Sequence, residues 1–206
     1  QENSKLPEIY IDLDGVLVDA CNWHRAALNS ALIKISNTEI KPEEHYSTFN
    51  GIPTKKKLQI LVEQGRVKKE DQEKIFHEKQ KSTIEIIEKS ALVRKEKIDL
   101  INKLKSKHIK AACFTNSIRE TANLMLEKTG VLSLFDKILT NQDVESPKPD
   151  PEGYIRIMEY FNCDPINTMI VEDSPKGMQA ARASKANVIM VKNPDQVNLS
   201  LMEQIL

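Results

Sequence analysis

The chain has 206 residues, of which 40% are hydrophobic and 5% aromatic, and its 30 basic residues balance its 30 acidic ones. This length and apolar content suit one domain of ordinary size, or one core with an insertion. A net charge of zero argues against a nucleic-acid partner held by bulk charge, and so few aromatics argue against a base-stacking surface. No stretch is long and apolar enough to span a membrane, so no membrane partner is expected.

The three cysteines indicate a reducing environment. Cys21, Cys113 and Cys163 are odd in number and widely spaced, with no CxxC pair, which is typical of unpaired thiols inside the cell. Cys113 lies in an apolar run and is predicted to be a small core residue. Because no apolar signal segment precedes Pro7, we expect a cytoplasmic protein. We also expect a monomer.

The first part of the chain predicts one buried strand followed by helices only. Residues 8–13 form a short apolar run with turn residues directly after it, which indicates a strand. Four helical segments follow without any strand signal, at 21–34, from Pro42, at 54–64 before Gly65, and at 69–89. This helical block is expected to form a second module of residues 19–89, inserted into a core of residues 1–18 and 90–206.

The second part of the chain alternates between helices and strands. Helices are predicted at 95–107, 118–129, 154–161 and 175–184. Apolar runs that indicate strands lie at 109–117, 135–140, 167–174 and 187–193. Such alternation predicts βαβ units, and therefore an α/β fold with a Rossmann-like parallel sheet covered by helices on both faces.

Polar residues follow three of the predicted strands. Asp12 and Asp14 point to the same side of the first strand, and two such charges about 4 Å apart repel by about 4 kcal/mol at an effective dielectric of 20. Residues 115–117 (TNS) end the second strand, residues 172–174 (EDS) end a later one, and Lys148 lies in the loop SPKPDP. Because the carboxyl ends of parallel strands form the ligand-binding edge of an open sheet, we expect these side chains to meet.

This group of residues has the chemistry of a phosphoryl-transfer site. Several carboxylates in one pocket need a cation, and Mg²⁺ is held by carboxylates, waters and phosphate oxygens. Asp12 could act as a nucleophile, and Asp14 could protonate the leaving oxygen and later deprotonate a water. Lys148 and the hydroxyl of Thr115 could bind the transferring phosphoryl oxygens.

Four segments, DLDGV, FTNS, SPKPDP and VEDSPKGMQAA, occur in this order and resemble the four motifs of the haloacid dehalogenase superfamily. The resemblance covers residues 8–192, and the helical block is similar to the cap domain of the β-phosphoglucomutase-like branch. It implies a nucleophile at Asp12, an acid/base at Asp14 and a catalytic, phosphate-binding lysine at Lys148. It further implies phosphate binding by Thr115 and Asn116, and magnesium binding by Asp12, Asp14 through its backbone carbonyl, Glu172 and Asp173.

The helical block holds further candidate residues. His24 is either a surface histidine or, by the resemblance, a residue that faces the active site. The loop around Gly51 resembles the cap loop that selects the substrate, which makes Gly51 and Thr54 candidates for substrate binding. Mutases of the branch place basic residues around this glycine, whereas this chain has Asn50 and Thr54. The lysine run 55–57 is predicted to be a solvated helix face, although its first lysine could replace the missing basic residue.

The function expected from these features is that of a Mg²⁺-dependent phosphatase that acts through a phospho-aspartate. Its substrate is expected to be a small phosphorylated metabolite, with a sugar phosphate favoured. The main alternative is a sugar-phosphate mutase of the β-phosphoglucomutase type. A dehalogenase is less favoured because Asp14 and the acidic pair resemble the phosphotransferase members, and a phosphonate hydrolase would need a Schiff-base lysine in the cap. A silent phosphate- or metal-sensing module would resemble receiver domains, which are shorter and lack the helical insertion.

Overall fold

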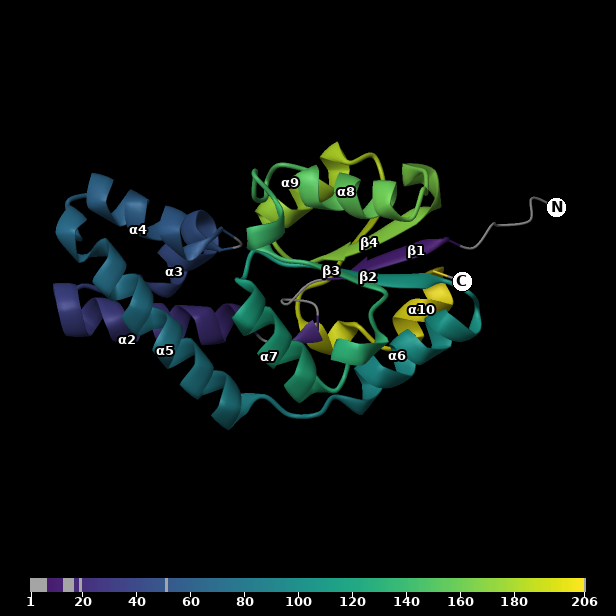
Figure 1. The fold of residues 1–206 in the computed structure, drawn as a ribbon, viewed down its shortest axis with the longest axis horizontal. Coiled ribbons are helices and arrows are strands. Elements are labelled where there is room, and N and C mark those ends of the chain that lie inside the picture. The colour runs from purple at the N-terminus through teal and green to yellow at the C-terminus, as the bar shows by residue number, and fades with distance from the viewer. Residues whose placement is uncertain (1–6, 13–16, 19, 51, 206) are drawn as a thin grey trace.

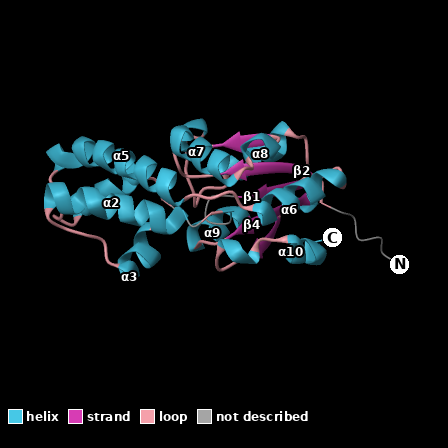
Figure 2. Ribbon diagram, turned by 90° about the horizontal axis from the view of Figure 1, so that it is seen from below, coloured by secondary structure: helices cyan, strands magenta, loops and turns pink. Residues whose placement is uncertain are grey.

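The fold is taken from a computed structural model that describes residues 7–12, 17–18, 20–50 and 52–205, with only the backbone described for residues 9–12, 202 and 205. Figure 1 shows an α/β core on one side and a separate group of helices, called the cap below, on the other. Figure 2, turned by 90°, shows the same division, with every labelled strand in the core. Within the described residues no helix is long and apolar enough to cross a membrane.

The core contains a parallel sheet with β1 at its centre. The described strands are β1 (Ile9–Asp12), β2 (Lys110–Phe114), β3 (Lys137–Leu139), β4 (Thr168–Glu172) and β5 (Asn187–Met190). Their order is β3-β2-β1-β4-β5, and every pairing is parallel. Asp12 pairs with Cys113 and Ile11 with Ile170, so the carboxyl ends of β1, β2 and β4 are adjacent. The predicted α/β class is confirmed.

Helices cover both faces of this sheet, as Figure 1 shows. On one face lie α6 (Lys95–Ser106), α7 (Arg119–Thr129) and α10 (Leu199–Ile205), and on the other lie α8 (Glu152–Tyr160) and α9 (Pro175–Ala183). The short helix α10 was not predicted from the sequence. One hydrophobic cluster joins sheet and helices, and it includes Cys113, which is buried as predicted.

The cap is built from helices between residues 20 and 90. In chain order these are α2 (Ala20–Ser36), α3 (Pro42–Glu44), a π-helix (His45–Phe49), α4 (Thr54–Glu63), a 3₁₀ turn (Lys69–Asp71) and α5 (Gln72–Ser90). The cap has its own hydrophobic cluster, with members such as Leu28, Phe49 and Leu61. Ala20 and Ile87, near the two ends of this segment, pack in the core cluster instead. The domain boundaries at 18/19 and 89/90 stay a prediction.

Turn residues fix the ends of the helices that matter for the site. Gly65 adopts φ +73°, a conformation that favours glycine, directly after the last turn of α4. Ser174 caps α9, because its hydroxyl accepts a hydrogen bond from the backbone N–H of Gly177, and Pro175 occupies the first helical position. This cap fixes the direction in which the chain leaves β4.

Candidate active site

A cavity of about 470 Å³ lies between the cap and the carboxyl ends of the core strands. From the core it is lined by residues that follow β2, β3 and β4 and by one loop lysine: Asn116, Ser117, Ile118, Thr121, Asn141, Gln142, Lys148, Asp173 and Ser174. From the cap it is lined chiefly by polar side chains, among them Cys21, His24, His45, Asn50, Thr54, Lys55, Lys57, Lys79 and Gln80. The predicted meeting of polar residues at the strand ends is thus seen for residues from two strands and the loop.

The segment after β2 turns its polar groups in different directions. Thr115 is buried, its N–H donates to the carbonyl of Leu139 at 3.0 Å, and its Oγ1 accepts from the N–H of Ser117 at 2.9 Å. Thr115 therefore braces this turn and does not itself line the cavity, whereas Asn116 and Ser117 do. Sequence reasoning noted Ser117 as part of the polar strand end but did not select it as a site residue.

Lys148 supplies a buried positive charge to the cavity. It is 3% exposed, and its Nζ lies 3.5 Å from Oε2 of Glu172 and 3.4 Å from the carbonyl oxygen of Phe114. The ring of Phe114 lies 4.8 Å from the same nitrogen. The Lys148–Pro149 peptide bond is cis. An ammonium held in a low-dielectric pocket is well suited to stabilise an anionic oxygen.

The two carboxylates after β4 have different surroundings. Glu172 is fully buried, and its Oε1 accepts from the N–H of Asp173 at 2.9 Å and from the N–H and hydroxyl of Ser174 at 3.2 and 3.3 Å. Its Oε2 accepts from the hydroxyl of Tyr154 at 2.8 Å. Asp173 is only partly buried and lines the cavity. Asp173 is therefore the carboxylate of this pair that a ligand in the cavity can reach.

A chain of hydrogen bonds joins the cap to the core through His24. Nζ of Lys79 lies 3.0 Å from Nδ1 of His24, and Nε2 of His24 lies 2.9 Å from Oγ of Ser117. Because an ammonium can only donate, Nδ1 accepts and the proton is assigned to Nε2, which donates to Ser117. His24 lines the cavity, and its role in the active site stays a prediction.

The cap also brings a buried histidine and a buried lysine to the cavity. Burial, and then the nearby charges of Lys57, Arg25 and His24, lower the pKa of His45 to about 4, so this imidazole is neutral at pH 7. Its Nε2 lies 3.2 Å from Sγ of Cys21. The prediction that residues 55–57 form a solvated face is wrong for Lys57, which is 5% exposed. Lys57 precedes the buried Leu61 by one helical turn, and so it falls on the packed face of α4.

Among the cap residues that line the cavity, sequence reasoning missed Lys57, Lys79 and His45. Lys57 and Lys79 each share a helix face with buried residues four positions away, and this spacing could have revealed them. No comparable signal marks His45, which lies at the start of the π-helix.

The structure describes most of the predicted site residues, but not all of them. Asp14 and Gly51 lie outside the described residues. For Asp12 the backbone alone is described, and it ends β1 beside β2. His24, Thr54, Asn116, Lys148 and Asp173 line the cavity, whereas Thr115 and Glu172 are buried next to it.

The donor set suits a hard divalent cation at the end of β1. Asp173 offers carboxylate oxygens to the cavity, and the β1 backbone brings Asp12 to the adjacent strand end. Oxygen donors of this kind favour Mg²⁺ or a similar ion over zinc. The described side chains alone contain no group of three acidic, histidine or cysteine residues that could hold a metal, so the predicted site also depends on Asp12 and Asp14.

Comparison with known proteins identifies the family. Residues 9–191 match the family model of haloacid dehalogenase-like hydrolases, so the chain belongs to this family. It is 29% identical over 181 residues to a phosphorylated carbohydrates phosphatase of Thermotoga maritima, covering 85% of this chain and 80% of that protein. It is 24% identical over 195 residues to a fructose-1-phosphate phosphatase of Escherichia coli, covering 89% and 95%. The chain is therefore a phosphohydrolase of the haloacid dehalogenase type.

Solved structures show the same fold. A β-phosphoglucomutase of Clostridium difficile superposes with a TM-score of 0.82 at 20% identity, over 97% of each chain. CbbY of Rhodobacter sphaeroides, in complex with phosphate, gives a TM-score of 0.77 at 20% identity over 90% of this chain and 86% of that one. The expected resemblance, an α/β core with a helical cap, is confirmed by these superpositions and by the family match.

Proposed function

We propose that this protein is a Mg²⁺-dependent phosphatase that hydrolyses a sugar phosphate, or a similar small phosphorylated metabolite, through a phospho-aspartate at Asp12. The observation that carries the proposal is the wall of the cavity, where buried Lys148 and the carboxylate of Asp173 lie beside the strand end that bears Asp12. Two similar proteins are named as phosphatases of phosphorylated carbohydrates and of fructose 1-phosphate, which supports the substrate class.

The residues divide the reaction between them. Asp12 attacks phosphorus while the bond from phosphorus to the leaving oxygen breaks, and Asp14 gives that oxygen a proton. Asp14 then takes a proton from the water that attacks the phosphorus of the phospho-aspartate, the bond from phosphorus to the Asp12 carboxylate breaks, and inorganic phosphate and free Asp12 result. Lys148 stabilises the charge spread over the phosphoryl oxygens. Asp12, the Asp14 carbonyl and Asp173 would hold a magnesium ion, which would supply positive charge to offset the negative charge of the carboxylates and the phosphate. The hydrogen bonds that Glu172 already accepts favour an indirect supporting role for that residue.

In this proposal the cap contributes to substrate binding and shields the reaction from water. A cavity of about 470 Å³ lies within the range of small-molecule sites and accommodates a sugar phosphate. His24, Thr54 and Gly51 are proposed to contact the part of the substrate beyond the phosphate. Closure of such a helical lid excludes bulk water during transfer. A cytoplasmic monomer that acts without nucleic acid or membrane remains part of this proposal.

Phosphate release from a panel of sugar phosphates and other small phosphate esters, with Mg²⁺ or with a chelator, tests the proposal. We expect release that depends on Mg²⁺ and is abolished by Asp12→Asn, because an amide cannot form the phospho-aspartate. Asp164→Asn changes an exposed carboxylate that precedes the amino end of β4, whereas the site lies at the carboxyl end of this strand, and it should leave turnover unchanged. Substantial turnover by Asp12→Asn would refute the covalent mechanism, and release unaffected by the chelator would refute the metal requirement.

A mutase of the β-phosphoglucomutase type is the second candidate. The observation that favours it is the pair of buried cap lysines, Lys57 and Lys79, which line the same cavity as Lys148 and offer positive charge for a second phosphate. The assay is conversion of glucose 1-phosphate to glucose 6-phosphate with a hexose bisphosphate as activator. Isomerisation faster than phosphate release would establish the mutase, and phosphate release alone would exclude it.

A further inference from the structure

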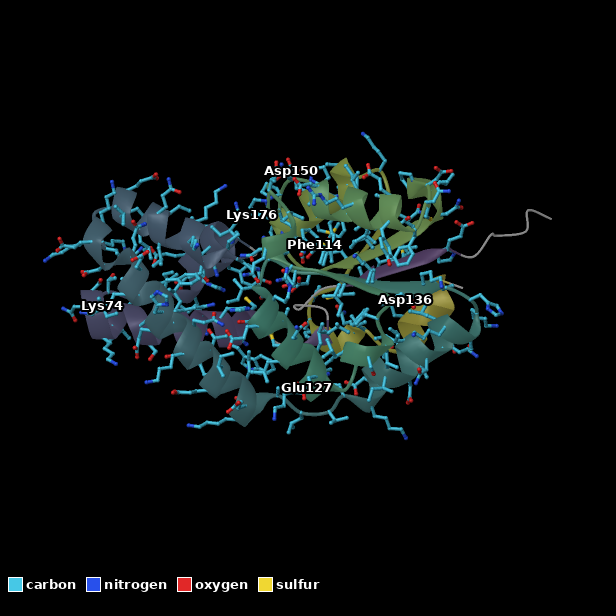
Figure 3. The ribbon with its side chains drawn as sticks, viewed as in Figure 1. Lys74, Phe114, Glu127, Asp136, Asp150 and Lys176 are labelled. Carbon is cyan, nitrogen blue, oxygen red and sulfur yellow. The ribbon has the colours of Figure 1, made fainter. Side chains whose placement is uncertain are left out.

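A buried tyrosine contacts both motif residues that surround the phosphate-binding lysine. Tyr154 lies on α8, is completely buried, and donates its hydroxyl to Oε2 of Glu172 at 2.8 Å. Its ring packs edge-to-face against Phe114, with centroids 5.2 Å apart. Figure 3 labels Phe114 in the interior of the core.

Lys148 is enclosed by the same groups. Its Nζ lies 4.8 Å from the ring of Phe114 and 5.4 Å from the ring of Tyr154, distances at which a cation is attracted to a ring. The same nitrogen lies 3.5 Å from Oε2 of Glu172. The carboxylate oxygen is therefore shared between a tyrosine hydroxyl at hydrogen-bond distance and an ammonium that is farther away.

The distances show which donor holds the carboxylate. A direct bond between an ammonium and a carboxylate is about 2.7–2.9 Å long, so the contact of Lys148 with Glu172 is loose. The shorter bond belongs to Tyr154. While the hydroxyl occupies Oε2, the ammonium is held near the carboxylate without being drawn onto it, and it keeps donors for a ligand in the cavity that Lys148 lines.

We propose that Tyr154 is a positioning residue for phosphate binding, in that its hydroxyl fixes Glu172 and so sets the place of the Lys148 ammonium. This rests on the proposed phosphatase function. Without the hydroxyl, Oε2 of Glu172 loses its closest donor, and the ammonium becomes the partner that replaces it. The lysine then moves toward a direct ion pair with Glu172 and away from the phosphoryl oxygens.

Core packing alone does not account for a tyrosine here. A phenylalanine would fill the same space against Phe114, and burying a hydroxyl costs free energy unless it is hydrogen-bonded. The hydroxyl donates to the same carboxylate oxygen that contacts Lys148. The hydroxyl of Tyr154 therefore affects the surroundings of Lys148.

Tyr154→Phe removes the hydroxyl and keeps the ring, and Tyr160→Phe, on an exposed tyrosine of the same helix, is the matched control. The measurements are the affinity for inorganic phosphate in Mg²⁺ by titration calorimetry, and kcat and KM with the best ester. We expect Tyr154→Phe to weaken phosphate binding about five- to tenfold and to lower kcat, which is the usual effect of one lost hydrogen bond. Tyr160→Phe should match the wild type.

A double-mutant cycle separates positioning from general stability. If Tyr154 acts through Lys148, Tyr154→Phe should not weaken phosphate binding further in a Lys148→Met background. The proposal is overturned if Tyr154→Phe weakens phosphate binding equally in the wild-type and Lys148→Met backgrounds, or if Tyr154→Phe binds phosphate as tightly as the wild type. It is also overturned if the Tyr154→Phe protein loses the native near-UV circular dichroism spectrum. A wild-type protein that hydrolyses esters while Tyr154→Phe is unaffected refutes only this inference, whereas a wild type that neither hydrolyses nor binds phosphate refutes the proposed function as well.

Discussion

Replacing Gly177 by alanine tests whether α9 must approach Glu172 as closely as the structure shows. A Cβ atom at this position would lie 1.9 Å from Cδ and 2.0 Å from Oε2 of Glu172. Such distances are far below van der Waals contact, so the carboxylate must move. It cannot move without stretching the hydrogen bonds from Asp173, Ser174 and Tyr154.

The expected cost follows from opposing contributions. Alanine is favoured over glycine within a helix by about 1 kcal/mol. Against this, crowding of a packed interior costs about 1–3 kcal/mol, and each hydrogen bond lost by the carboxylate costs about 1 kcal/mol. With two such bonds lost, Gly177→Ala should destabilise the protein by about 2–4 kcal/mol. In a chain of this size that lowers Tm by about 4–16 °C.

The assay is thermal unfolding followed by calorimetry, together with ester hydrolysis. Gln179→Ala, an exposed position on the same helix, is the control and should leave Tm unchanged. Because Glu172 contacts Lys148, we expect Gly177→Ala to lose hydrolytic activity at temperatures where it is still folded. A Gly177→Ala variant that melts within about 1 °C of the wild type, with full activity, would refute the close packing of α9 on Glu172.

Three further predictions concern buried ionisable side chains. The pKa of His45 is about 4 in the folded protein, below its ordinary 6.5, so as the pH drops from 7 to 5 the unfolded chain takes up a proton first and the free energy of unfolding falls by about 2 kcal/mol. Urea unfolding of His45→Gln should lack this part of the loss. An equal loss of stability in the wild type and in His45→Gln would contradict the prediction. Lys97, fully buried, donates to the carbonyls of Pro194 and Val197, so Lys97→Met should cost about 2–4 kcal/mol in urea unfolding while the exposed Lys95→Met costs little. Lys79→Met should lower kcat/KM by about tenfold through the loss of its contact with His24, and an effect no larger than that of the exposed Lys81→Met would contradict this role.

Local pattern predicted the core well because the relevant signals lie within a few residues of one another. The apolar runs of the strands and the Ser174–Pro175 start of α9 are short-range features, and each falls where the structure has it. The polar strand ends also follow from local sequence, since parallel strands bring their carboxyl ends to one edge. Lys148 and Asp173 could be assigned to one site for that reason.

The cap was predicted less completely because its cavity is formed between helices that are distant in sequence. In the sequence, Lys57 belongs to a run of lysines that predicts a solvated helix face. Only the packing of α4 against the rest of the cap buries it. His45 has no periodic pattern to mark it. Its low pKa depends on burial and on Lys57, Arg25 and His24, which come from other segments of the cap.

The sequence by itself determined the family, the parallel α/β core and the set of acidic and basic residues gathered at its strand ends, because these depend on ordered motifs and short-range periodicity. Tertiary structure alone decided how those groups divide their roles. Both oxygens of Glu172 are taken by neighbours while Asp173 faces the cavity, and no spacing distinguishes two adjacent carboxylates. The buried hydroxyl of Tyr154, on α8, reaches Glu172 at the end of β4, and contacts between such distant segments exist only once the chain has folded.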